Sequence, residues 1–174
     1  MTLQAIYDDA IRPALGLLPI RMTSKRAIYW MLAIHLQEDP DCRRVQVMPA
    51  GSTMEPPARG LWQFEQGGGV RGVLFHPRTG ELAMKVCQER GLVKPLEPRA
   101  VWLRLAEDDV LAAAFARLLL WSDGYPLPPI GDEDAGWAMY CDRLWRPGRP
   151  HHERWPANCL SAEEFVAGLG VADV

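Results

Sequence analysis

The chain has 174 residues, which is enough for one domain with a hydrophobic core and too few for two domains of ordinary size. Hydrophobic residues make up 48% and charged residues 24% of the sequence, a composition of folded globular proteins that excludes a disordered chain. A formal net charge of -3 and the lack of a lysine- and arginine-rich cluster in the sequence exclude nucleic acid as an expected partner.

Neither a membrane span nor a secretory signal is expected. A span needs roughly 18 consecutive apolar residues, and Lys25, His35 and Glu38 interrupt the most apolar region. Asp8 and Asp9 lie where a secretory signal would have basic residues and then an apolar run, so we expect synthesis in a cytoplasm without a signal peptide. Widely spaced cysteines without a C-x-x-C pair predict free thiols, at positions Cys42, Cys87, Cys141 and Cys159.

The first half of the chain predicts two helices followed by a loop region. Apolar spacing predicts a helix from Leu3 to Leu15, interrupted near its end by Pro13. A second helix is expected over 25–39, with Thr23 or Ser24 as its N-cap. Val45 and Val47 predict a short strand within a proline- and glycine-containing loop, and a short helix or turn is expected over 60–66.

The second half predicts further helices. One is expected over 82–90, where Gly91 supplies a C-terminal cap. Dense apolar residues over 98–121 predict a buried central helix. A helix over 132–145 follows a stiff proline-rich segment, and a last short helix over 161–167 is expected from a capping box of Ser161 and Glu164.

These elements predict a mainly α fold with at most a small β element at the rim of a cleft. We expect one domain over 1–174, in which the tail 146–174 packs on the helical bundle.

The pair of acids Glu38 and Asp39 is the most informative local feature, because its position conflicts with helix stability. Two acids at the C-terminal end of a helix face the negative end of its dipole, so helix stability does not explain them. A neighbouring acid and the dipole both raise the pKa of a carboxyl group, which is a requirement of a general acid at neutral pH. The alternative is that both acids lie in solvent before a turn.

Two segments resemble motifs of phage proteins in the lysozyme-like, lytic transglycosylase superfamily. Residues 33–39, Ala-Ile-His-Leu-Gln-Glu-Asp, resemble an apolar helix that ends in Gln-Glu-Ser, and 57–65 contain Gly-Leu-Trp-Gln-Phe in place of a groove motif. The resemblance implies a lysozyme-like helical domain with Glu38 as the catalytic acid. It also implies a saccharide groove formed by Gly60, Leu61, Trp62 and Gln63, with Tyr125 in a fainter downstream match.

The sequence departs from this family at two points. Asp39 stands where the family has Ser, and no Tyr-Asn-x-Gly-like motif is present, for which Trp137, Tyr140 and Trp145 are partial substitutes. Both departures favour reduced or lost catalysis.

The resemblance implies a single-carboxylate reaction on peptidoglycan. Glu38 would protonate the glycosidic oxygen between N-acetylmuramic acid and N-acetylglucosamine, and would then accept the proton of the sugar 6-hydroxyl as an anhydro ring closes. A two-carboxylate hydrolysis would need Glu65 or Glu55, and we favour a structural role for Glu65. Trp62 either stacks on a sugar or belongs to the core, whereas Gln63 needs hydrogen-bond partners within its apolar motif.

Other patterns are weaker. His151 and His152 match no standard zinc spacing, and the glycine run 67–69 lacks the Gly-Lys-Ser/Thr ending of a phosphate loop, so we expect neither a metal nor a cofactor. Trp145 and Trp155, with the arginines around them, either bind a partner or pack the tail on the bundle.

The leading hypothesis is a virion-associated or lysis-related phage protein that degrades peptidoglycan by the lytic transglycosylase route. The alternatives are a structural virion protein, in the tail or ejected, with a catalytically weakened lysozyme-like fold, and a saccharide- or protein-binding module without turnover. The expected partners are peptidoglycan glycan strands and other virion proteins.

Overall fold

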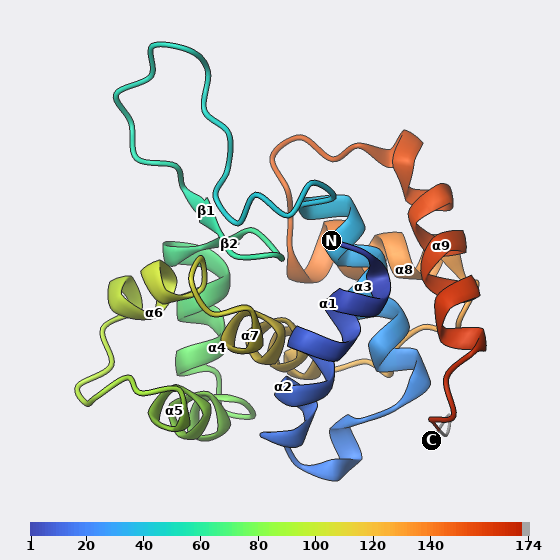
Figure 1. Cartoon of the computed structure of the whole chain (residues 1–174), viewed down its shortest axis with the longest axis horizontal. Coiled ribbons are helices and arrows are strands. Elements are labelled where there is room, and N and C mark those ends of the chain that lie inside the picture. Colours follow the sequence, from blue (N-terminus) through green and yellow to red (C-terminus); the bar gives the residue numbers. More distant parts are fainter. Residues whose placement is uncertain (172–174) are drawn as a thin grey trace.

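The computed structural model describes residues 1–171, so the last three residues of the predicted tail lie outside it. Helices form most of the chain, and one two-stranded antiparallel sheet accompanies them, as predicted (Figure 1). The elements are α1 (Leu3–Ile6), η1 (Tyr7–Ile11), α2 (Arg12–Gly16), η2 (Ile20–Met22), α3 (Lys25–Glu38), β1 (Ala58–Arg59), β2 (Phe64–Glu65), η3 (Gln66–Val70), α4 (Arg71–Phe75), α5 (Gly80–Glu89), α6 (Pro98–Arg104), α7 (Asp109–Ser122), α8 (Glu133–Trp137), η4 (Ala138–Leu144), η5 (His152–Arg154) and α9 (Trp155–Ala167).

The N-terminal helix runs without a break through α1, η1 and α2, close to the predicted bounds. The middle segment η1 is a π turn, in which the Arg12 N–H bonds to the Tyr7 carbonyl five residues earlier. Pro13 follows this turn directly, and the helix continues past it as α2 to Gly16. The predicted interruption at Pro13 is therefore wrong, because the wider turn accommodates the proline.

The core is built around α3 and α7. Every residue from 27 to 35 on α3 and from 111 to 120 on α7 is buried. Ser24 caps α3 by accepting a hydrogen bond from the Ala27 N–H at 3.1 Å. His35 lies inside with Nδ1 2.9 Å from the Leu61 carbonyl oxygen, so it is a core histidine with a hydrogen-bond partner.

The predicted single helix over 98–121 is wrong, because α6 and α7 are separate. Asp108 lies between them and caps α7 by accepting a hydrogen bond from the Leu111 N–H at 3.0 Å. Its carboxylate also contacts Arg90 Nε at 2.8 Å and Arg104 Nε at 3.8 Å. An N-cap fixed by two cations begins a new helix within a continuous apolar pattern.

The small sheet lies beside the long loop that follows α3 (Figure 1). Ala58 pairs with Glu65 and Arg59 with Phe64. Val45 makes only an isolated bridge to Arg59, and Val47 is exposed, so the strand predicted over 45–47 does not form. Arg44 anchors the start of the loop through two hydrogen bonds of 2.7 Å to the Asp109 carboxylate.

The helix predicted over 82–90 is present as α5. The Leu92 N–H bonds to the Cys87 carbonyl and the Gly91 N–H to the Gln88 carbonyl, with a φ of +82° at Gly91. These two bonds form the Schellman cap that glycine favours. No helix was predicted where α4 forms, and the glycines 67–69 lie in the π turn η3 that leads into α4.

The C-terminal segments pack on α3. The helix predicted over 132–145 is formed by α8 and η4 in succession. The last helix α9 begins at Trp155, earlier than expected, so Ser161 lies inside it and its hydroxyl donates to the Ala157 carbonyl at 2.9 Å. The predicted capping box is wrong for this reason. The Trp155 ring stacks on Trp30 of α3 at 6.0 Å between centroids, which fixes the tail to the bundle.

All four cysteines are free thiols in the structure, as predicted. None of the helices formed within residues 1–171 is both long enough and apolar enough to cross a membrane.

Candidate active site

A cleft of about 1160 Å³ opens between the end of α3, the β1–β2 hairpin and the segment 143–154. Three residues singled out from the sequence line it together, namely Glu38, Gln63 and Glu65. They are joined there by Tyr140. The cleft therefore brings the predicted acid and part of the predicted groove motif to one place.

Glu38 is the last residue of α3, and its half-buried side chain reaches the cleft. The pKa of Glu38 is raised to about 7, chiefly by burial. The charges of Glu65 and Asp39 also raise it, whereas the hydrogen bond from Tyr140 and the charge of Arg154 lower it. A carboxyl group with this pKa occurs in both protonation states near neutral pH. It is suited to donate a proton and then to accept one.

Tyr140 holds one oxygen of this carboxyl group. Its hydroxyl donates a 2.7 Å hydrogen bond to Glu38 Oε1, and its buried ring stacks on Trp155 at 5.3 Å between centroids. Burial raises the pKa of Tyr140, as does the neighbouring Glu38 carboxylate, so the hydroxyl stays protonated and remains a donor. The bond leaves Glu38 Oε2 as the second oxygen of the acid. The sequence analysis noted Tyr140 only as a partial substitute for the missing motif.

Asp39 does not line the cleft, although it follows Glu38 directly. Its buried carboxylate accepts hydrogen bonds from the Arg43 and Arg44 backbone N–H groups, each at 2.8 Å. Asp39 thus fixes the turn that begins the long loop. Its charge acts on the Glu38 carboxyl group at a distance and does not occupy the site.

The first three residues of the Gly-Leu-Trp-Gln-Phe motif belong to the core and not to the cleft lining. Gly60 has a φ of +77°, and a Cβ there would lie 2.8 Å from the Leu105 carbonyl oxygen. Leu61 is fully buried, and so is Trp62, whose Nε1 donates to the Met31 carbonyl at 2.8 Å. Trp62 is therefore a core residue, and the sugar-stacking alternative for this side chain is wrong.

Gln63 of the motif lines the cleft, as does Glu65, which follows the motif. Gln63 has a φ of +46° in the hairpin turn, where its Nε2 donates to the Gly60 carbonyl at 2.9 Å. This bond meets the expectation that the amide finds a partner. Glu65 at the end of β2 is exposed at the cleft. The structure thus places a second carboxylate in the same cleft as Glu38.

Tyr125 does not line the cleft, contrary to its predicted place in the groove. Its side chain is 68% exposed, and the Arg143 guanidinium lies 5.2 Å from its ring centroid. Arg143 does line the cleft and pairs with Asp123 at 3.0 Å. Tyr125 is therefore linked to the cleft only through this arginine.

The two C-terminal tryptophans differ in position. Trp155 is buried, with Nε1 donating to the Glu133 carbonyl at 3.0 Å, so it packs the tail and is not part of an exposed patch. Trp145 is half-buried in the cleft wall, where Nε1 donates to the Trp62 carbonyl at 3.0 Å. Trp145 offers the aromatic surface that the sequence analysis sought at Trp62.

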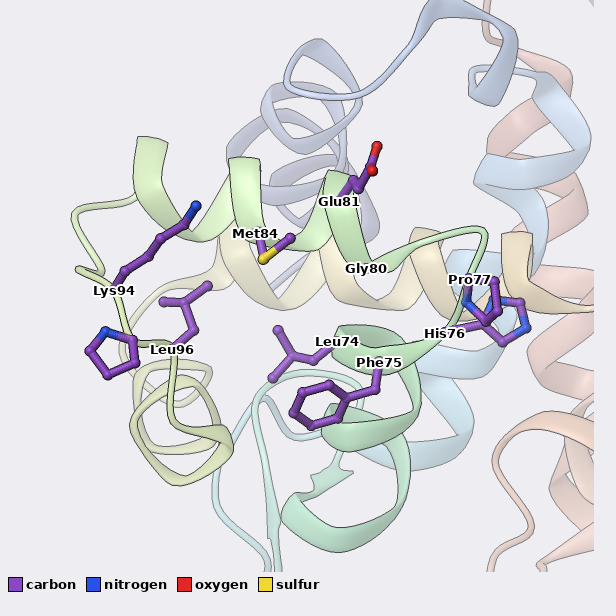
Figure 2. Close-up of a pocket in the computed structure, with 10 residues that line it drawn as sticks. Leu74, Phe75, His76, Pro77, Gly80, Glu81, Met84, Lys94 and Leu96 are labelled. Carbon is purple, nitrogen blue, oxygen red and sulfur yellow. The ribbon is translucent and has the colours of Figure 1, made fainter.

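A second pocket, of about 820 Å³, lies between α4, α5 and the segment before α6 (Figure 2). Phe75, Met84 and Leu96 line it, with Glu81 and Lys94 among its polar side chains (Figure 2). It has no counterpart of the Glu38–Tyr140 pair, so it is not the candidate active site. Within residues 1–171 no group of three or more histidine, cysteine or acidic side chains is placed to hold a metal ion.

Comparisons with known proteins do not extend these observations. No protein-family model matches the chain, and no match was found among curated proteins or solved structures.

Proposed function

We propose that the protein cleaves the glycan strands of peptidoglycan by the lytic transglycosylase route, with Glu38 as its acid and base. The observation that carries the proposal is the Glu38 carboxyl group at the cleft, with a pKa raised to about 7 and one oxygen held by Tyr140. The motif resemblance in the sequence supports the same residue. It is also the basis for proposing a virion-associated or lysis-related role in a phage.

The reaction follows from the two states of one carboxyl group. Protonated Glu38 donates its proton to the glycosidic oxygen, so that the bond breaks as an oxocarbenium-like centre develops on the muramic acid. The ionised carboxylate then accepts the proton of the 6-hydroxyl, whose oxygen attacks that centre and closes the anhydro ring. Tyr140 stabilises the ionised state through its hydrogen bond, so the carboxylate is a moderate base after the first step.

The surroundings of Glu38 suit a saccharide. Gln63 supplies an amide at the turn, and Trp145 supplies half-buried aromatic surface. A pyranose ring has both polar edges and apolar faces, so it is complementary to this mixture. Asp39 is used in the turn after α3, so its presence in place of serine leaves the Glu38 carboxyl group in the cleft.

Hydrolysis is the second candidate reaction, because Glu65 lies at the same cleft. Two carboxylates on either side of a glycosidic bond are the usual arrangement in glycoside hydrolases. In that case Glu65 would activate a water or attack the sugar, and the product would carry a free reducing end.

The test is clearing of purified peptidoglycan by the unchanged protein and by Glu38→Gln, with mass spectrometry of the released fragments. We expect anhydro-muropeptides from the unchanged protein and no clearing by Glu38→Gln, whereas Glu164→Gln, an exposed glutamate on α9, should clear normally. Reducing-end products that disappear in Glu65→Gln would establish hydrolysis instead. If none of the proteins clears under conditions in which an active lysozyme does, the enzymatic proposal is wrong, and the structural virion role takes its place.

A further inference from the structure

One wall of the cleft carries an unusual concentration of arginine. The segment 143–154 contains four arginines and one glutamate, although the whole chain has a net charge of -3. All four arginines line the cleft, and they are Arg143, Arg146, Arg149 and Arg154. Three of them are the arginines around Trp145 and Trp155, for which the sequence left partner binding open, and the structure places all three at the cleft.

Most of this positive charge is not neutralised by the protein. Arg143 pairs with Asp123, but no carboxylate within residues 1–171 forms an ion pair with Arg146, Arg149 or Arg154. Glu153, the acid within the segment, lies 3.0 Å from His151 Nδ1 and does not line the cleft. Arg146 Nε donates to the Asp142 carbonyl at 3.1 Å, and the charge of Arg154 acts on Glu38, but none of the three guanidinium groups has a carboxylate of the described residues within ion-pair distance. Their positive charge can therefore attract an anion that enters the cleft.

The segment that carries these arginines is held at both ends. At its start the Trp145 indole donates to the Trp62 carbonyl at 3.0 Å. At its end the Gln37 amide donates to the His151 carbonyl at 3.0 Å, and Gln37 itself accepts from Asn158 at 2.8 Å. Between these points the sequence Arg-Pro-Gly-Arg-Pro, over 146–150, contains two prolines that restrict the backbone. The arginines are therefore presented from a fixed wall, which reduces the ordering cost of binding.

The ligand must also suit the carboxyl groups of the cleft. Glu38 and Glu65 line the same cleft as the arginines, so a uniformly charged polyanion such as a nucleic acid would place phosphates near carboxylates. A glycan whose sugars carry acidic side branches suits both kinds of group, because its neutral sugars can lie at Glu38 while its branches reach the arginines. Peptidoglycan has this chemistry, since the stem peptide on each muramic acid carries carboxylates beside the scissile bond.

We propose that the arginine wall, defined as Arg146, Arg149 and Arg154, binds the carboxylates of the stem peptide and makes the protein selective for peptide-bearing glycan strands. The proposal rests on the proposed function, because it assumes that the glycan lies in the cleft at Glu38. It adds a recognition site for the branch, which the acid and base chemistry does not require.

The test measures binding in the Glu38→Gln background, so that turnover does not interfere. The probes are soluble, uncrosslinked glycan strands with their stem peptides and the same strands after an amidase has removed the peptides. Affinity is followed by calorimetry for Glu38→Gln alone and with Arg146→Gln and Arg149→Gln added. A matched control with Arg12→Gln and Lys85→Gln removes two exposed charges outside the cleft.

We expect peptide-bearing strands to bind about tenfold more tightly than stripped strands, as two solvent-exposed ion pairs would give. The Arg146→Gln, Arg149→Gln protein should lose this preference and keep its affinity for stripped strands, whereas the control should retain both affinities. Equal binding of the two kinds of strand to the parent protein overturns the inference but leaves the proposed function intact. If neither kind of strand binds, the proposed function is wrong as well.

Discussion

Replacement of Glu38 by glutamine should stabilise the protein above neutral pH. The folded state raises the pKa of Glu38 from an ordinary 4.5 to about 7, chiefly through burial. Between these two pH values the folded chain retains a proton on Glu38 that the unfolded chain has released. The free energy of unfolding therefore falls as the pH rises through this window and is lowest above pH 7. Glutamine has no charge to bury, and its oxygen can still accept the Tyr140 hydrogen bond.

The magnitude follows from the change in proton affinity. At about 1.4 kcal/mol for each tenfold change, the difference between 4.5 and about 7 corresponds to roughly 3 kcal/mol. Water in the cleft reaches the half-buried carboxyl group and reduces this cost, so we expect a gain of about 2 kcal/mol for Glu38→Gln at pH 8. At pH 4.5 the unchanged protein carries a neutral Glu38, and the two proteins should differ by less than about 0.5 kcal/mol.

Urea unfolding at pH 4.5, 6 and 8, followed by tryptophan fluorescence, measures these differences. Glu164→Gln on α9 is the matched control, because its exposed side chain should give no gain at any of the three pH values. A Glu38→Gln protein that is no more stable than the parent at pH 8, or a gain that does not change with pH, would refute the description of Glu38 as an enclosed acid.

Three further predictions test the surroundings of the site. Tyr140→Phe removes the hydrogen bond that favours the ionised Glu38 carboxylate, so the pKa of Glu38 should rise. The alkaline limb of the pH profile for peptidoglycan cleavage should then move to higher pH, and an unchanged limb would contradict the role of Tyr140. Asp39→Ala leaves two backbone N–H groups without their acceptor and should lower the free energy of unfolding, measured in urea, by about 1–3 kcal/mol. A cost near zero would mean that the turn does not depend on this carboxylate. Gly136→Ala places a Cβ against the Trp30 ring and should cost about 1–3 kcal/mol in thermal melts. Gly16→Ala, where a Cβ would meet no atom within 4 Å, is the control and should cost nothing.

Local sequence patterns were sufficient to predict several elements of the fold. The helix 25–38 follows from apolar spacing and the Ser24 cap, and α5 follows from Gly91, because caps and periodicity act through neighbours in the chain. The same approach failed over 98–121, where the Asp108 cap is held by Arg90, the residue that follows α5. It also failed to find α4, whose few residues carry too little periodicity to distinguish a helix from a loop.

The candidate site was likewise predicted in part from local sequence, and the rest of it depends on tertiary contacts. The sequence by itself singled out Glu38 as a candidate, because two acids at the negative end of a helix conflict with local stability and because the residues around them resemble a known motif. Only the tertiary structure decided that Glu38 lines a cleft and Asp39 does not. It also decided that Trp62 is buried whereas Trp145 lines the cleft, and that the arginines of 143–154 all lie at the cleft. The physical reason is that burial, a raised pKa and Tyr140's hydrogen bond across 102 residues depend on contacts between distant segments, which local spacing does not contain.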